Sequence, residues 1–183
     1  MDKLYPREFL LNIAKLFKEY CDEVGSDTFE TMEIVGSLRR GKEQCHDIDL
    51  LVVPKFHTTE ALFGEGEKVS MFDSIDLSGF ATVEKNGTKL KQLTYKSGLN
   101  KVNIDVYVSI HPYSYGVLKV IRTGPESFSH RIVKPVEYGG CMPKLHHVED
   151  GFLKNNYDVV DCSTELMFFE AIGMDYIKPK DRK

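Results

Sequence analysis

The stretch that decides the fold is GSLRRGKEQCHDIDLL, residues 36–51. It begins with Gly-Ser, passes through a charged segment and enters the apolar run 48–53, which predicts a strand. Asp47 and Asp49 are two residues apart at the start of this strand, so both carboxylates should point to one face. Oxygen ligands in that arrangement suit one or two divalent cations. The stretch therefore predicts a turn and a strand that together present a metal-binding face.

The turn before this strand contains the residue types that bind phosphate. Gly36 would let the backbone approach a ligand closely, and the Ser37 hydroxyl and nearby amides can donate to phosphate oxygens. Arg40 offers a planar guanidinium to the terminal phosphates. Each feature alone is common in proteins, as a simple turn, a solvated acidic pair or an exposed pair of arginines. Their order and spacing favour a site for a triphosphate.

A third carboxylate lies in the run 102–108, where Val and Ile alternate with polar residues. This period of two predicts a half-buried strand, with Asp105 on the face opposite the apolar side chains. Clustered carboxylates repel one another unless a cation is bound, and phosphoryl transfer uses such a cluster to hold two metal ions. We therefore expect Asp47, Asp49 and Asp105 to bind two Mg²⁺ ions, with Mn²⁺ as a substitute.

The first half of the chain also predicts a helix and a hairpin. Apolar residues recur at three- and four-residue steps after Pro6 and indicate an amphipathic helix; they are Phe9, Ile13, Phe17, Cys21 and Val24. The Asn86-Gly87 pair between the strand-like runs 79–85 and 88–95 is typical of a tight hairpin. These elements predict a mixed sheet with flanking helices.

The second half predicts shorter helices and irregular segments. Pro112 and Pro125 are placed to start helices on either side of a break at Thr123-Gly124, and a further helix is expected over 164–172. The fold class is therefore α+β, a mixed α/β arrangement. We expect residues 1–110 to form the catalytic domain and residues 111–183 a smaller α+β subdomain.

Composition is that of a globular protein. The chain has 183 residues, of which 42% are hydrophobic and 28% charged, enough for a real core in one compact unit or two small domains. Lys and Arg number 24 against 28 Asp and Glu, giving a net charge of -4. Enzymes that bind nucleic acid usually carry excess positive charge, so the basic residues are expected to cluster or the binding to be weak.

Targeting and cysteine patterns point to an intracellular protein, and the absence of a coiled-coil pattern favours a monomer. The four cysteines lack the spacing of a zinc knuckle or a redox pair. The N-terminal residues lack the apolar core of a signal peptide, and no apolar run is long enough to span a membrane. No heptad repeat predicts a coiled-coil dimer. We expect a cytoplasmic or otherwise intracellular protein, with a nuclear or viral compartment included, and neither secretion nor a membrane partner.

Five segments in order resemble the motifs of family X DNA polymerases, the polymerase beta-like nucleotidyltransferases. They are GSLRRG (36–41), DID (47–49), NIDVYV (103–108), RTGPESF (122–128) and DYIKPKDR (175–182). The first two are shared with the wider nucleotidyltransferase superfamily, and the last two narrow the resemblance. It runs from about Pro6 to the C-terminus and implies a nucleotidyltransferase palm followed by a small subdomain that closes over the nucleotide. The chain is similar in plan to very small viral family X polymerases, so no lyase or helix-hairpin-helix domain is expected.

The resemblance also implies roles for the chemical groups. Asp47 and Asp49 would bind both metal ions, and Asp105 would bind the catalytic metal and orient the proton of the acceptor hydroxyl. Ser37 and Arg40 would hold the triphosphate. Backbone access for the triphosphate would come at Gly36.

Further positions carried over from the resemblance concern the sugar and the nucleic acid. Thr123 and Gly124 would lie against the sugar of the nucleotide. Just before them the family usually has an aromatic residue, whereas this chain has Ile121-Arg122, which predicts weak discrimination against ribonucleotides. Nucleic-acid contacts are expected from Arg122, Ser129, His130, Arg131 and Lys180. The basic end, which includes Lys180 and Arg182, is either a solvated tail or a phosphate-neutralising segment.

These observations favour a DNA-directed DNA polymerase of the repair type. It would fill gaps by transferring dNMP from a dNTP to a primer 3′-hydroxyl with release of pyrophosphate, and its partners would be primer–template or gapped DNA and nucleoside triphosphates. One alternative is an untemplated nucleotidyltransferase that acts on a nucleic-acid end, a protein side chain or a small molecule. Another is a non-catalytic nucleic-acid-binding protein, against which the presence of all three carboxylates argues.

Overall fold

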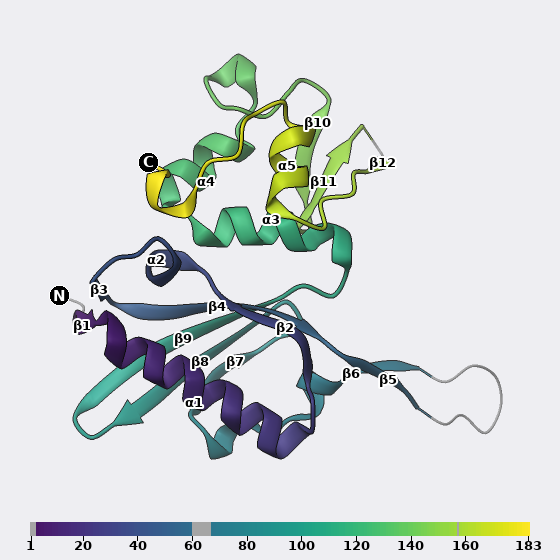
Figure 1. Cartoon of the computed structure of the whole chain (residues 1–183). Helices are drawn as coiled ribbons and strands as arrows, with labels where there is room; N and C mark the ends of the chain where they lie inside the picture. The colour runs from purple at the N-terminus through teal and green to yellow at the C-terminus, as the bar shows by residue number, and fades with distance from the viewer. Residues whose placement is uncertain (1–2, 60–66, 157) are drawn as a thin grey trace. The chain divides into compact units, whose positions relative to one another are not determined.

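The computed structural model describes residues 3–59, 67–156 and 158–183, and the chain forms two compact units (Figure 1). Unit 1 comprises Met1–Ile34 and Glu43–Val108, and unit 2 comprises Val35–Lys42 and Ser109–Lys183. The sequence-based division at residue 110 placed 35–42 with the first half. In the structure this segment packs with the second unit, because its arginine side chains bind there.

Unit 1 is built on a five-stranded mixed sheet with strand order β2-β4-β9-β8-β7. The strands are β2 (Phe29–Ile34), β4 (Asp47–Pro54), β7 (Thr82–Asn86), β8 (Leu90–Ser97) and β9 (Asn100–Val108). β4 and β9 are parallel, whereas the other neighbours are antiparallel. The predicted hairpin is confirmed as β7 and β8. Its first strand starts later than expected, because 77–79 form a 3-10 turn instead.

Helix α1 (Arg7–Gly25) covers one face of this sheet (Figure 1). The predicted stripe is only partly right: Leu10 and Ala14 are buried beside Ile13, whereas Val24 is 50% exposed. The covered face of the sheet consists of the apolar members of the alternating strands. These include Ile48, Leu50 and Val52 on β4, Leu93 on β8, and Val102, Ile104 and Val106 on β9.

Short elements complete unit 1 around this core. They are β1 (Tyr5–Pro6) paired with β3 (Gln44–Cys45), β5 (Phe56–Thr58) paired with β6 (Lys68–Ser70), and the 3-10 turns η1 (Met71–Ser74) and η2 (Leu77–Gly79). The rings of Phe17 and Phe72 meet edge to face with centroids 6.4 Å apart. This contact fixes η1 beneath α1.

Unit 2 combines helices with a small antiparallel sheet. Its elements are α2 (Gly36–Arg39), α3 (Pro112–Thr123), α4 (Glu126–Val133), η3 (Val136–Tyr138), β10 (His146–Glu149), β11 (Phe152–Asn155), β12 (Asp158–Val159), α5 (Glu165–Ala171) and η4 (Pro179–Asp181). The helix starts predicted at Pro112 and Pro125 are confirmed, and Thr164 caps α5 by accepting a hydrogen bond from the Met167 amide at 3.2 Å. Both units therefore have the mixed α+β character expected from the sequence.

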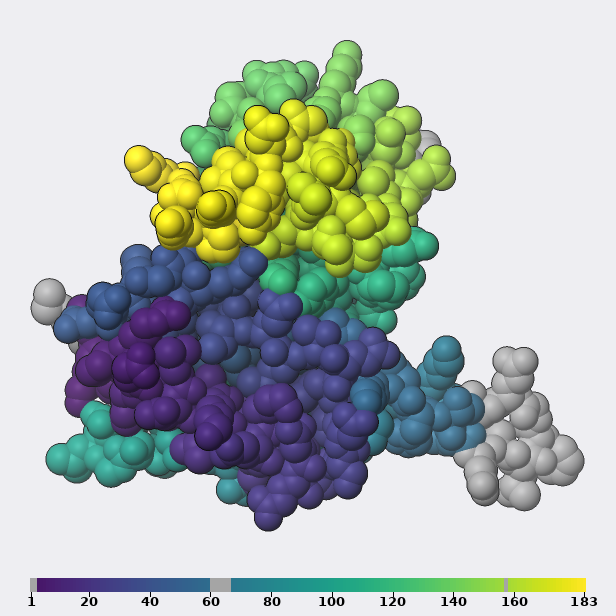
Figure 2. All heavy atoms as spheres, viewed as in Figure 1, coloured from purple at the N-terminus to yellow at the C-terminus, as the bar shows by residue number. Residues whose placement is uncertain are grey.

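The core of unit 2 lies between α3, α4 and α5. Its buried members are Val117, Val120, Phe128, Ile132, Met142, Leu153, Cys162, Phe168, Phe169 and Ile172. The C-terminal segment, yellow in Figure 2, lies against this unit instead of extending away from it. No helix in the described ranges is both long and apolar enough to cross a lipid bilayer.

Candidate functional site

The face of the unit 1 sheet opposite α1 carries the predicted carboxylates. In the parallel pairing of β4 with β9, Asp49 is the direct partner of Asp105, and Asp47 is the partner of Asn103. Adjacent strands are about 4.8 Å apart, and paired residues point to the same face. Since Ile48 lies on the buried face, all three aspartates lie on the other one. The fold thus brings together two strand segments that are more than 50 residues apart in sequence.

Asp105 is half-buried and is held by neutral donors. The Gln92 amide donates to its Oδ1 at 3.0 Å, and the Tyr107 hydroxyl donates to Oδ2 at 3.4 Å. Sequence reasoning did not single out either donor. Tyr107 was detectable, because residues two apart in a strand share a face. Gln92 was not, since its position opposite Asp105 depends on the β8–β9 register.

A cavity of about 240 Å³ opens on this polar face. Its walls are formed by Asp47, Glu84, Gln92, Leu93, Thr94, Asn103 and Asp105. Its lining includes two of the three predicted metal ligands. The volume is small for an organic ligand and is suited to ions with their bound waters.

The three aspartates fit a divalent cation in ligand type, and they lie on one face of the sheet. Carboxylate oxygens are the ligands that Mg²⁺ prefers, and the register gives Asp49 and Asp105 a shared position on neighbouring strands. Within residues 3–59, 67–156 and 158–183, however, no three His, Cys, Asp or Glu side chains are arranged as a ready-made metal site. The ligands are therefore on the right face but not drawn together.

The predicted phosphate-binding turn is a single turn of helix, α2, in unit 2. Gly36 is its first residue and has a φ of 63°, a conformation that residues with a side chain rarely adopt. Glycine is therefore required here for the backbone to enter α2. The Arg40 amide donates to the Gly36 carbonyl at 3.2 Å, which closes the turn and leaves Ser37 half-buried on it.

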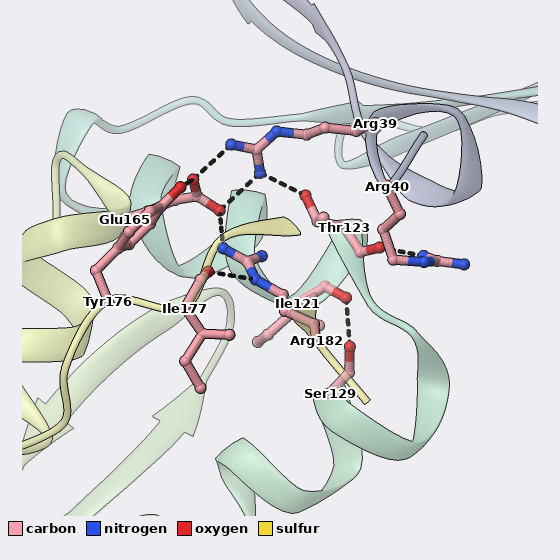
Figure 3. A network of polar contacts seen from close by, with 9 residues as sticks. All are labelled: Arg39, Arg40, Ile121, Thr123, Ser129, Glu165, Tyr176, Ile177 and Arg182. Carbon is pink, nitrogen blue, oxygen red and sulfur yellow. Dashed lines mark hydrogen bonds and ion pairs between the residues drawn. The ribbon is translucent and has the colours of Figure 1, made fainter. Parts of the chain in front are cut away.

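A buried ionic network fixes α2 to the rest of unit 2 (Figure 3). Arg39 binds Glu165 in a bidentate manner, with Nη1 to Oε1 at 2.7 Å and Nη2 to Oε2 at 2.5 Å. Arg39 Nη1 also donates to the Thr123 hydroxyl at 2.7 Å. Fork-to-fork pairing of this kind defines both distance and orientation. Sequence reasoning gave an exposed arginine pair as the common alternative reading of Arg39-Arg40, and it missed Glu165.

The other side of Glu165 is bound by Arg182, the second-last residue of the chain. Arg182 Nη2 donates to Glu165 Oε1 at 2.9 Å, and Arg182 Nε donates to the Ile177 carbonyl at 3.0 Å. Its guanidinium carbon lies 5.5 Å from the ring centroids of Phe128 and Phe169. Both readings of the basic end, solvated tail or phosphate contact, are therefore wrong for Arg182, which is 4% exposed. A buried carboxylate and an aromatic cage draw it into the core.

Glu165 keeps its negative charge despite its burial. Burial on its own would raise the pKa of this carboxyl, but the hydrogen bonds from Arg39 and the charges of Arg182 and Arg39 outweigh it and hold the pKa below its usual range. The Tyr176 hydroxyl donates a further hydrogen bond at 3.4 Å. The network is thus one anion shared by two cations.

Arg40, Thr123 and Gly124 are brought together in unit 2, as Figure 3 shows for the first two. Arg40 Nη1 donates to the Thr123 carbonyl. Gly124 has a φ of 66°, and a Cβ there would lie only 3.0 Å from Arg40 Nη1. The positive φ favours glycine at this position, and an added Cβ would contact the Arg40 guanidinium.

The predicted nucleic-acid contacts in unit 2 differ in their accessibility. Ser129 is half-buried and donates to the Ile121 carbonyl at 2.7 Å, so its hydroxyl already has a structural partner. The other four are exposed, namely Arg122 in the last turn of α3, His130 and Arg131 on α4, and Lys180 in η4. These four remain predictions.

Comparison with known proteins shows similarity to DNA polymerases. The family model described as DNA polymerase beta palm matches residues 5–94, which include Gly36, Asp47 and Asp49. DNA polymerase lambda of Rattus norvegicus is 26% identical over 165 residues, and the alignment covers 80% of this chain. The chain spans only 28% of the length of that relative.

Proposed function

We propose that this chain, which is a family X polymerase-like protein, transfers a nucleotide from a nucleoside triphosphate to the 3′-hydroxyl of a nucleic-acid strand. The observation that carries the proposal is the register of β4 with β9, which gives Asp47, Asp49 and Asp105 one common polar face. Three carboxylates on one face are the donor set that nucleotidyl transfer with two divalent cations requires.

In this proposal the three aspartates hold the cations, and Asp105 also orients the acceptor hydroxyl. When bound, the cations would favour deprotonation of the acceptor hydroxyl and neutralise the charge on the triphosphate. The neutral hydrogen bonds from Gln92 and Tyr107 keep the Asp105 carboxylate in a fixed orientation. Supporting partners of this kind commonly tune how a carboxylate binds metal.

Unit 2 supplies the groups for the triphosphate. The Gly36 backbone and the Ser37 hydroxyl would donate to phosphate oxygens, and Arg40 would pair with the terminal phosphates. The Arg39–Glu165–Arg182 network holds the short helix α2 that carries these groups. Glu165 is therefore a positioning residue in this proposal.

The finer proposal is templated gap filling on DNA with Mg²⁺ or Mn²⁺. Its nucleic-acid contacts would be the exposed side chains of Arg122, His130, Arg131 and Lys180. Because Ile121-Arg122 replaces the aromatic residue usual in the family, incorporation of dCTP and rCTP opposite a template G should agree within about a hundredfold, or ~3 kcal/mol.

Extension of a labelled primer tests the proposal directly. The full chain is incubated with Mg²⁺ or Mn²⁺, single dNTPs or rNTPs, and the primer either alone or on a one-nucleotide gap. Addition of only the nucleotide complementary to the template is expected. Addition that ignores the template would support the untemplated alternative, and no addition under either metal would contradict nucleotidyl transfer to this acceptor.

A further inference from the structure

A second cavity lies beside the aspartate face of unit 1 and differs from it in charge. It has a volume of about 420 Å³ and is lined by Lys3, Tyr5, His46, Asp47, Leu99, Lys101 and Asn103. Asp47 and Asn103 line this cavity and the smaller one that contains Asp105. The two cavities therefore adjoin along the starts of β4 and β9.

The walls of the larger cavity are fixed by contacts from distant parts of unit 1. The hydroxyl of the buried Tyr5 donates a hydrogen bond to the Lys101 carbonyl at 2.6 Å, which connects β1 to β9. Lys3 donates to the Asn100 side chain, and its ammonium lies 5.5 Å from the Tyr5 ring centroid. The His46 ring contacts the Lys3 carbonyl at 3.3 Å. These contacts connect the segment before α1 to β9 and to the start of β4 around the cavity.

Two lysines give the cavity its positive charge. Lys3 and Lys101 are both exposed, and within the described part of the chain neither ammonium forms an ion pair with a carboxylate. Asp47 supplies the opposing charge at one edge, and a divalent cation bound there would cancel it. The two lysines outnumber the one aspartate, so the lining of the cavity is positively charged and suits an anion, although the chain as a whole has a net charge of -4.

We infer that this cavity binds a backbone phosphate of the acceptor strand, upstream of its 3′-hydroxyl. The inference rests on the proposed function, in which Asp105 orients that hydroxyl. Residues 101, 103 and 105 share one face of β9, so Lys101 and Asn103 continue the line that starts at Asp105. An acceptor strand whose hydroxyl lies at Asp105 would place its next phosphates along this line, where a basic groove tracks the backbone. In the proposed function the triphosphate already has candidate ligands of its own, on α2.

The test uses fluorescence anisotropy with a labelled primer–template, the full chain and Mg²⁺, without nucleotide. Lys3→Ala/Lys101→Ala is compared with Lys15→Ala/Lys18→Ala, which removes the same charge from exposed positions on α1. Each phosphate contact contributes roughly 0.7–0.9 to the slope of log affinity against log salt. Because the cavity is proposed to hold one phosphate, the cavity variant should lose roughly 0.7–0.9 of slope, and the α1 control should lose none. If the double variant melts at a lower temperature, Lys101→Gln, which keeps most of the stem, is measured instead.

Single methylphosphonate substitutions, which remove the charge of one phosphate, identify the strand. At one of the three phosphates nearest the acceptor 3′ end, the substitution should weaken binding to the wild type and leave the cavity variant unaffected. Additive losses at all three positions, or coupling only on the template strand, would overturn the inference. The proposed function is judged separately by extension: coupling without any nucleotide addition would contradict that function and leave the phosphate site standing.

Discussion

Two carboxylates in this molecule, Asp105 in unit 1 and Glu165 in unit 2, have hydrogen-bond partners of different charge. Asp105 is half-buried on a sheet face and accepts hydrogen bonds from an amide and a phenol. Glu165 is 7% exposed and accepts hydrogen bonds from two guanidinium groups. The first carboxylate is oriented by neutral donors, and the second has its charge neutralised by cations.

The difference separates a group suited to bind a ligand from a group that holds the fold. Neutral donors orient a carboxylate without cancelling its charge, so a cation still gains the full attraction when it binds. The charge of a buried carboxylate between two arginines is already neutralised, so the carboxylate attracts a further cation only weakly. Removing it would leave buried cations without a partner. Substitutions at the two positions should therefore affect different quantities.

The largest expected effect is on catalysis at Asp105. Asp105→Ala should lower nucleotide addition by roughly three decades or more, since an acid–base group alone contributes about 10²–10⁴ and this carboxylate is also a proposed metal ligand. The melting temperature should stay the same or rise, because one of three like charges is removed. Single-turnover extension and thermal unfolding of the same preparation check both parts. Extension at the wild-type rate would remove Asp105 from the site.

The next effect is on stability at Glu165. Glu165→Gln should reduce the free energy of unfolding by about 3–5 kcal/mol, because Arg39 and Arg182 lose their shared counter-ion. Glu170→Gln, an exposed change on the same helix, is the matched control. Urea unfolding of both variants gives the comparison. Equal stability of the two would show that the network is not a structural element.

A smaller effect is expected at Arg40, which is held by a hydrogen bond within unit 2 and is also proposed to bind the triphosphate. Arg40→Ala should lower kcat/KM for the nucleotide by roughly one to two decades, as expected for the loss of a charge-assisted phosphate contact. Lys144→Ala, an exposed change in the same unit, should leave steady-state kinetics unaltered. A variant of Arg40 with wild-type kinetics would make Arg39 the next candidate.

The smallest effect is the pH dependence that Glu165 gives to folding. Its pKa in the folded protein is below its usual range, whereas the unfolded chain should have a value of about 4.3. Between these two values the unfolded state binds more protons, so the contribution is complete above about pH 4.3 and is lost as the pH falls through the folded pKa. The stability gap between wild type and Glu165→Gln, measured by urea unfolding from pH 7 to pH 3, should therefore narrow only at the acidic end. If the stability difference between the two proteins already narrowed near neutral pH, the folded-state pKa of Glu165 would be raised and not lowered, which would contradict this prediction.

Several features followed from local sequence because their physical cause is local. The alternation of Val102, Ile104 and Val106 predicted a strand with one polar face, and Asp47-Ile48-Asp49 predicted two carboxylates on one face. Asn86-Gly87 predicted the hairpin, and Pro112 predicted a helix start. In each case the side-chain period or the backbone preference of one residue type is enough.

The sequence by itself thus determined the elements, the polar face of each strand and the residue types that could bind metal and phosphate. Only the tertiary structure decided which of these residues meet. The parallel register of β4 and β9 made Asp49 the partner of Asp105, and the packing of unit 2 placed Arg182 on Glu165 with Arg39. The reason is that periodicity repeats along a strand or helix and carries no information about its partner, whereas strand register and the pairing of buried charges depend on segments far away in the chain.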